Sequence, residues 1–237
     1  MPALPPLREK VATLPSVGRA SSLIKICGLK TAPTVDAAVE AGADMLGFNF
    51  VKASPRYVPS QEAKPLVERL FGKAKSVGLF ADTPVDEIKA VQDILALDYI
   101  QLHGSEPLSA IEAVREATGA KVILAKGVSA KPDLPLAGHP DFFLFDAKPP
   151  KGEKAYGGHG QVFDWSILDA YAHDVPWLLA GGLTADNVAD AIAACKDIKG
   201  FSGVDVSSGV EKAKGEKDLR QIVDFVAAAR AAMGAIC

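Results

Sequence analysis

Short apolar runs, each about as long as a buried strand, alternate along this chain with longer stretches of helical periodicity. Strands that are buried on both faces read as continuous apolar runs, and helices between them let consecutive strands lie parallel. Eight such runs occur: Leu23–Cys27, Met45–Phe50, Ser76–Phe80, Tyr99–His103, Val122–Lys126, Phe142–Asp146, Trp177–Ala180 and Gly200–Val206. Parallel strands with helical crossovers can close on themselves, so this pattern predicts an α/β protein built as a single (β/α)8 TIM barrel.

The segments between the runs agree with this prediction. The clearest helical segments are Thr34–Ala41, Ser60–Leu70, Val85–Leu95, Leu108–Ala117, Ala185–Cys195 and Leu219–Met233. Segment Ser129–Gly138 is an exception, because its prolines leave room for at most a short helix. A doubly wound open sheet would require a GxGxxG fingerprint after the first strand, and Gly28–Thr31 does not have that pattern. The barrel is therefore favoured over the open sheet.

Length and composition suit one compact domain. The chain has 237 residues, of which 49% are hydrophobic, and we expect the barrel to occupy residues 23–237. Residues 1–22 are Pro-rich and lack the apolar block of a secretory signal, so we expect a loosely ordered extension there. The net charge is −3 and the basic residues are scattered, which argues against nucleic acid as a partner. No apolar stretch approaches the roughly 20 residues that a membrane span needs, so no membrane partner is expected.

The cysteines and histidines exclude further classes of site. Cys27, Cys195 and Cys237 show no CxxC spacing and leave one thiol unpaired in any disulfide scheme, which favours the reducing cytoplasm. The four histidines have no ligand spacing, so neither a metal nor another cofactor is expected.

In a barrel of this kind the active site lies at the carboxyl ends of the strands. Cys27 and Asp146 both stand at such ends, on the first and sixth strands. Cys27 could be an ordinary small core residue, and Asp146 could simply pair with Lys126, Lys148 or a backbone N–H. A thiol and a carboxyl group facing each other across the barrel mouth would instead suit a general base and a general acid acting on one small substrate.

Glycine-rich pieces follow the last two strands. Gly181 and Gly182 come after the seventh strand, and Ser207, Ser208 and Gly209 come after the eighth. Barrels commonly bind phosphate at these two loops through backbone N–H groups, which favours a phosphate site over simple tight turns.

Other polar residues at the strand ends are candidates for the pocket. Alternation along the first strand places Lys25 on the same inward face as Cys27. Gln101 and His103 in YIQLHG and Asp205 on the eighth strand are also expected to line the pocket. His103 is an alternative base, although no carboxylate is visibly placed to orient it. Arg56, in SPRYVP, offers a fork of donors suited to a carboxylate, unless it is a solvated surface charge.

The motifs KICGL, SPRYVP, QLHG, FDAK, GGHGxxFDW, AGGLTxxNV and DVSSGVE stand in this order along the chain. In this combination the chain resembles the phosphoribosylanthranilate isomerase family of tryptophan biosynthesis, over about residues 23–233. The resemblance implies a cofactor-free Amadori rearrangement of a phosphorylated aminosugar, N-(5-phosphoribosyl)anthranilate, to 1-(2-carboxyphenylamino)-1-deoxyribulose 5-phosphate, by an enzyme that is a monomer or a homodimer.

The resemblance also implies a role for each site residue. Cys27 would be the general base and Asp146 the general acid, Arg56 would bind the anthranilate carboxylate, and the two glycine-rich loops would hold the phosphate. Because a thiol acts as a base only through its thiolate, we expect a lowered pKa at Cys27, with Lys25 as a contributor. The chain departs from the family pattern at His159, in the segment GVEKAKGEKD and in its N-terminal extension.

Two other functions remain open from the residues. A related phosphate-binding barrel is one, either indole-glycerol-phosphate synthase or an aldolase in which Lys25 or Lys126 forms a Schiff base. The other is a sugar-phosphate binding module without activity, because fold alone does not imply catalysis.

Overall fold

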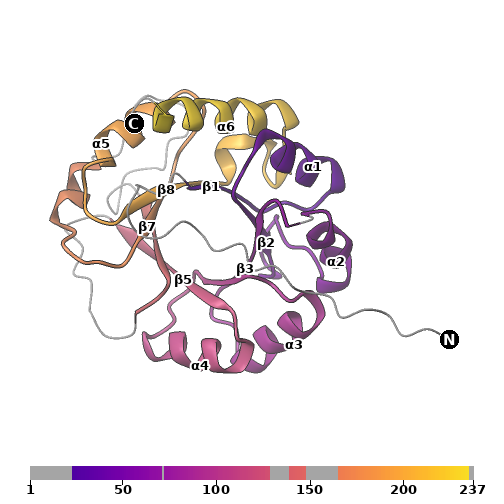
Figure 1. Ribbon diagram of the computed structural model, residues 1–237. Helices are drawn as coiled ribbons and strands as arrows, with labels where there is room; N and C mark the ends of the chain where they lie inside the picture. The colour runs from indigo at the N-terminus through magenta and orange to yellow at the C-terminus, as the bar shows by residue number, and fades with distance from the viewer. Residues whose placement is uncertain (1–22, 71, 129–138, 148–164, 235–237) are drawn as a thin grey trace.

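The computed structural model describes residues 23–70, 72–128, 139–147 and 165–234 of the chain. Within them, eight parallel strands form a closed barrel in sequence order, viewed along its axis in Figure 1. The strands are β1 Leu23–Cys27, β2 Met45–Asn49, β3 Lys75–Phe80, β4 Tyr99–Leu102, β5 Lys121–Val128, β6 Phe142–Ala147, β7 Trp177–Ala180 and β8 Phe201–Val206. The predicted (β/α)8 barrel is confirmed. The expectations for residues 1–22 and 129–138 lie outside the described residues.

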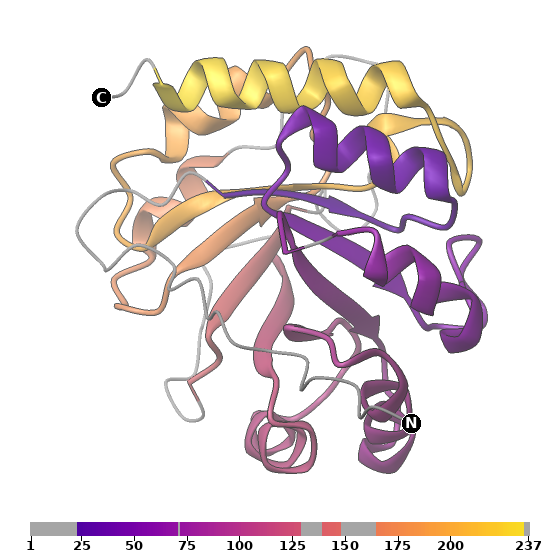
Figure 2. The ribbon, with the colours of Figure 1, turned by 45° about the vertical axis from the view of Figure 1, so that its right-hand side comes forward.

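Helices form a ring around the strands (Figure 1). They are α1 Ala32–Ala41, α2 Ser60–Glu68, α3 Val85–Leu95, α4 Ser109–Thr118, α5 Val188–Cys195 and α6 Leu219–Gly234, with short 3-10 helices η1 Trp165–Ala170 and η2 Ser208–Val210. Figure 2 shows α1 and α6 side by side, and the contacts between them agree. An antiparallel hairpin that the sequence did not predict, β9 Glu211–Ala213 with β10 Glu216–Lys217, lies between β8 and α6.

Because side chains point alternately to the two faces of each strand, the buried apolar residues form two separate cores. Ile24 and Ile26 of β1 belong to the larger core, which is shared with the helices. The inward-facing core inside the barrel contains Leu23, Met45, Val77, Tyr99, Ile123, Ala125, Phe142, Leu144, Leu178 and Ala180. Burial of this surface is the main driving force for folding, because apolar area removed from water contributes roughly 25 cal/mol per Å².

Three aspartates repeat one hydrogen bond between neighbouring strands. Asp44, Asp98 and Asp141 each stand just before an even-numbered strand and accept the backbone N–H of Ile24, Ser76 and Val122 at 2.7, 2.9 and 2.9 Å. A cation accompanies each carboxylate, namely Arg230, Lys75 or Arg115. These contacts lie near the amino ends of the strands, so they stabilise the barrel away from the carboxyl ends.

Several predicted element boundaries differ from the observed ones, most of all the start of α5. Helix α5 begins at Val188 rather than at Ala185, because the Asn187 side chain closes a turn before it. Asn187 Oδ1 accepts the backbone N–H of Thr184 at 2.8 Å, and Asn187 Nδ2 donates to the Gly182 carbonyl oxygen at 3.0 Å. Among the described residues, no helix has the length and apolar character needed to cross a bilayer.

Candidate active site

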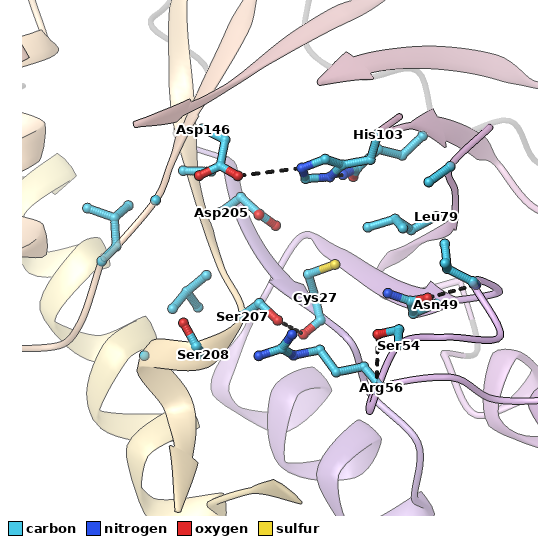
Figure 3. Close-up of a pocket in the computed structure, with 18 of the residues that line it drawn as sticks. Cys27, Asn49, Ser54, Arg56, Leu79, His103, Asp146, Asp205, Ser207 and Ser208 are labelled. Carbon is cyan, nitrogen blue, oxygen red and sulfur yellow. Dashed lines mark hydrogen bonds and ion pairs between the residues drawn. The ribbon is translucent and has the colours of Figure 1, made fainter. Parts of the chain in front are cut away.

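A cavity of about 380 Å³ opens at the carboxyl ends of the barrel strands, and Figure 3 shows its lining. Its volume is within the range of small-molecule sites. Most of the predicted site residues line it, namely Cys27, Arg56, Gln101, His103, Asp146, Gly181, Gly182, Asp205, Ser207, Ser208 and Gly209. The structure thus brings the thiol of β1 and the carboxyl group of β6 into one cavity, together with both glycine-rich loops.

Cys27 ends β1, and two glycines make room around it. Its neighbour in register on β2 is Gly47, where a Cβ atom would lie 3.0 Å from the Cys27 Sγ. Gly28 has φ +80° and donates its N–H to the Gly47 carbonyl oxygen at 2.8 Å, so the chain turns directly after the thiol. Cys27 is only 4% exposed. It nevertheless lines the cavity, as Figure 3 shows.

The electrostatic surroundings of Cys27 overturn one expectation. Burial raises the pKa of the Cys27 thiol, because the thiolate loses solvation there. The positive charges of Lys25 and Lys217 act to lower this pKa but do not outweigh burial, and the Asp205 carboxylate raises it further. The expected contribution of Lys25 therefore has the right sign, whereas the expected net lowering is wrong.

Lys25 lies beneath the cavity rather than in its lining. It is fully buried inside the barrel, and its Nζ is 2.6 Å from Asp205 Oδ1, across the register pair of β1 and β8. Although burial acts to lower the pKa of Lys25, Asp205 and Cys27 together outweigh it and the pKa is raised. The expectation that Lys25 lines the pocket is wrong, and a protonated, paired amine is unsuited to be a Schiff-base nucleophile.

Lys126, the other candidate for a Schiff base, is not among the residues that line the cavity. On β5, Ile123 and Ala125 point into the barrel, whereas Leu124 and Val128 pack in the outer core. Because side chains alternate along a strand, Lys126 shares the outward face with Leu124 and Val128.

Asp146 on β6 lies close to His103, which follows β4 on the other side of β5. Its Oδ2 is 3.5 Å from His103 Nε2, and this pair is drawn in Figure 3. Gln101 is fully buried, and its amide Nε2 donates to His103 Nδ1 at 2.9 Å. Because an amide nitrogen only donates, this bond favours the tautomer with its proton on Nε2, aimed at Asp146. No carboxylate placed to orient His103 was visible in the sequence, and the structure supplies Asp146, which meets His103 rather than Lys126.

The two glycine-rich loops meet at the cavity. Gly181 and Gly182 have φ angles of +91° and +64°, which favour glycine. A Cβ atom at Gly209 would lie 1.8 Å from the Leu183 carbonyl oxygen, so only glycine allows the loops after β7 and β8 to touch. Ser207 Oγ donates to the Cys27 carbonyl oxygen at 3.2 Å, which joins this region to the end of β1.

Arg56 lies in the loop after β2 and lines the cavity, but it is not free. Its Nε and Nη2 donate to Glu211 Oε1 and Oε2 at 2.7 and 2.9 Å. A Cβ atom at Gly28 would lie 2.7 Å from the Arg56 Cδ, so Gly28 also leaves room for this side chain. Sequence reasoning missed Glu211 and Lys217; the only signal was the acidic residue directly after the SSGV segment.

In the part of the chain that the structure describes, no group of three or more His, Cys, Asp or Glu side chains could hold a metal ion. The cavity lining contains a thiol, a carboxyl group and an imidazole, three groups that can transfer protons. Arg56 adds a cation to this lining.

Comparisons with known proteins agree with this site. The family model described as N-(5'phosphoribosyl)anthranilate (PRA) isomerase matches residues 24–228. N-(5'-phosphoribosyl)anthranilate isomerase from Bradyrhizobium sp. (strain BTAi1) is 44% identical over 216 residues, which cover 90% of this chain and 97% of the relative. The relative from Rhodospirillum rubrum is also 44% identical, over 88% of this chain and 98% of its own length.

Solved structures show the same likeness. TrpF from Jonesia denitrificans has a TM-score of 0.77 and 34% identity, over 90% of this chain and 98% of that structure. A phosphoribosyl anthranilate isomerase in complex with reduced 1-(o-carboxyphenylamino)-1-deoxyribulose 5-phosphate has a TM-score of 0.72 and 30% identity, over 89% and 99% of the two chains. The chain belongs to the N-(5'-phosphoribosyl)anthranilate isomerase family.

Proposed function

We propose that this barrel converts N-(5-phosphoribosyl)anthranilate to 1-(2-carboxyphenylamino)-1-deoxyribulose 5-phosphate in tryptophan biosynthesis, with Cys27 as the general base and Asp146 as the general acid. One observation carries the proposal: Cys27 and Asp146, from strands that are not neighbours, line the same cavity as the paired glycine-rich loops. General acid–base catalysis requires both groups to reach the same bound substrate.

The charged ends of this substrate have matching sites in the cavity. The phosphate would lie against the backbone of the Gly181–Gly182 and Ser207–Gly209 loops, which line the cavity and whose glycines carry no side chain to block N–H groups. The anthranilate carboxylate would lie against Arg56. With both ends held, the ribose carbons would lie between Cys27 and Asp146.

The proposed reaction is an isomerisation in which proton transfers drive ring opening and a shift of the double bond. Asp146 gives a proton to the ribose ring oxygen, the bond from that oxygen to C1 breaks, and the nitrogen lone pair forms a Schiff base with C1. The Cys27 thiolate then takes the proton from C2, and the electrons of that C–H bond form an enolamine. When the C2 hydroxyl loses its proton and C1 gains one, the ketone results, and no atom is gained or lost overall.

The reactive protonation state pairs a Cys27 thiolate with a protonated Asp146. Burial disfavours the thiolate, so the rate should follow the small fraction of molecules that carry the thiolate and the protonated carboxyl group together. His103, held by Gln101, faces Asp146, and we propose that it keeps the carboxyl group turned toward the cavity.

We also propose a cytoplasmic enzyme that works as a monomer or a homodimer. The free thiols Cys27 and Cys195 fit a reducing compartment. A structural relative with a TM-score of 0.68 is described as mutually generated monomers of a dimeric phosphoribosylanthranilate isomerase from Thermotoga maritima.

The test is the disappearance of anthranilate-type fluorescence when purified protein meets freshly made phosphoribosylanthranilate. We expect turnover by the wild type, and a loss of about 10²- to 10⁴-fold in kcat for either Cys27→Ala or Asp146→Asn. Cys195→Ala is the matched control, because Cys195 is buried among the outer helices. Full turnover by both site variants would refute the assignment.

A further inference from the structure

The hairpin β9–β10 supplies a carboxylate that holds Arg56 from one side. Glu211 accepts from Nε and Nη2 of Arg56, and its Oε2 also accepts the backbone N–H of Gly215 at 3.0 Å. The Glu211 side chain is only 4% exposed, whereas the Arg56 side chain is 22% exposed. Both carboxylate oxygens are therefore committed to the protein, and the guanidinium keeps one edge toward the cavity.

Lys217, at the end of β10, holds the same carboxylate. Its Nζ donates to Glu211 Oε1 at 2.8 Å and to the Ser207 carbonyl oxygen at 2.8 Å, and the Lys217 side chain is 2% exposed. The carboxylate thus bridges two cations, while Lys217 also joins the hairpin to the proposed phosphate loop.

The backbone of the hairpin packs on the loop that carries Arg56. A Cβ atom at Gly215 would lie 2.5 Å from the Pro55 carbonyl oxygen, so the hairpin turn touches the residue next to Arg56. The same carbonyl oxygen accepts a hydrogen bond from Lys30 Nζ at 2.9 Å. Since a Cβ atom at Gly28 would lie 2.7 Å from the Arg56 Cδ, the Arg56 side chain also packs on the end of β1.

The donors that remain on Arg56 fit one more carboxylate. A guanidinium has five N–H donors, and the side-on pair with Glu211 uses Nε–H and one of the two on Nη2. The Nη1 donors and the second Nη2 donor are left for an end-on pair. The charges agree with this count. Arg56 and Lys217 are two cations and Glu211 is one carboxylate, so a net charge of about +1 remains to bind a monoanionic substrate carboxylate.

We propose that Glu211 and Lys217 are positioning residues, which hold Arg56 so that its outer edge receives the carboxylate of the substrate. The inference rests on the proposed function. It predicts that Glu211 acts on affinity for the carboxylate through Arg56, rather than on the proton transfers at Cys27 and Asp146.

Binding of two stable ligands separates this role from a general structural one. The first is reduced 1-(o-carboxyphenylamino)-1-deoxyribulose 5-phosphate, and the second is the same molecule without its carboxylate. For Glu211→Gln we expect the Kd of the first ligand to rise about 10- to 100-fold, as when a charge-assisted hydrogen bond is lost, and that of the second to change less than about threefold. For Lys217→Met we expect a smaller rise in the Kd of the first ligand.

Two controls complete the design. Glu216→Gln changes an exposed carboxylate of the same hairpin, whose Oε2 is 3.8 Å from Lys212, and should leave both Kd values unchanged. In a double-mutant cycle, Glu211→Gln should add almost nothing to Arg56→Met for the first ligand. In steady-state turnover, Glu211→Gln should raise KM far more than it lowers kcat.

The outcomes are distinguishable. Equal weakening of both ligands by Glu211→Gln, an unchanged affinity for the first ligand, or full additivity with Arg56→Met would each overturn the inference while the proposed function stands. A wild type that binds neither ligand and turns over no phosphoribosylanthranilate would overturn both. Thermal unfolding of each variant checks that the measured protein is folded.

Discussion

Lys25 and Asp205 form a buried ion pair inside the barrel, on the adjacent strands β1 and β8, with 2.6 Å between Nζ and Oδ1. Cys27 lies two residues further along β1, so the pair stands directly below the thiol. The positive partner lowers the pKa of Cys27 and the negative partner raises it. The ionisation of the thiol therefore depends on a pair of which Asp205 lines the cavity and Lys25 does not.

Removing the positive partner should make the thiol harder to ionise. In Lys25→Met the pKa of Cys27 should rise further, because the attraction of Lys25 is lost while the Asp205 carboxylate stays. Thiolate absorbance against pH measures this, with Cys27→Ser as the blank. Lys25→Met/Asp205→Asn should shift less, because it removes both charges. A Cys27 titration that is the same in the wild type and Lys25→Met would refute this account of the thiol.

The reactivity of the Cys27 thiol should rise with pH. Because burial raises the pKa of Cys27, the thiolate fraction falls about tenfold per pH unit below that pKa, so alkylation of Cys27 by iodoacetamide, which requires the thiolate, should accelerate through pH 7 and 8. The midpoint should lie above the ordinary thiol value of about 8.5. The measurement is the rate of Cys27 alkylation against pH, followed by mass spectrometry. A plateau in this rate that already begins below pH 7 would contradict the raised pKa.

Acid should weaken the contact between Glu211 and its cations. Burial acts to raise the pKa of Glu211, but hydrogen bonds from Arg56, Lys217 and the Gly215 N–H outweigh it and lower that pKa to about 2. Because the folded value is below the unfolded value of about 4.3, the stabilisation is complete above about pH 4.3 and is lost as pH falls toward 2. A shift of this size corresponds to about 3 kcal/mol of unfolding free energy at pH 7.

Denaturant unfolding at several pH values measures this contribution. Glu211→Gln should be less stable than the wild type at pH 7, and the difference should shrink between about pH 4.3 and 2. Glu216→Gln, on the exposed side of the same hairpin, should match the wild type throughout. A difference for Glu211→Gln that stays constant with pH would show that the loss is not due to the charge.

Gly209→Ala should separate the two glycine-rich loops. The new Cβ atom would lie 1.8 Å from the Leu183 carbonyl oxygen, so backbone must move at the proposed phosphate site. We expect the affinity for inorganic phosphate, measured as competitive inhibition, to fall about tenfold or more. Gly234→Ala, whose Cβ would meet nothing within 4 Å, is the control. Unchanged inhibition in Gly209→Ala would place the phosphate elsewhere.

The sequence predicted the barrel because a buried parallel strand is a local signal. The runs that end at Cys27 and Asp146 needed only their apolar character and their position to be recognised. Since the carboxyl ends of parallel strands gather at one face, the order of elements was enough to bring both residues to one cavity.

The parts that were missed depend on contacts between distant segments. Arg56 and Glu211 are 155 positions apart, and β9 and β10 span only three and two residues, too short for a periodic pattern. The sign of the pKa shift at Cys27 was also missed, because it depends on how completely the neighbouring strands exclude water. The contact between His103 and Asp146 could not be predicted either, because it depends on how two separate strands lie in the barrel.

The most direct test of the account is the fate of the C2 hydrogen of the substrate. With phosphoribosylanthranilate deuterated at C2 of the ribose, the wild type should release deuterium to solvent as product forms. In both Asp146→Asn and Cys27→Ala, the rate of deuterium release should fall by about 10²- to 10⁴-fold. If Cys27→Ala releases deuterium at the wild-type rate, the base is another group and the central claim is wrong.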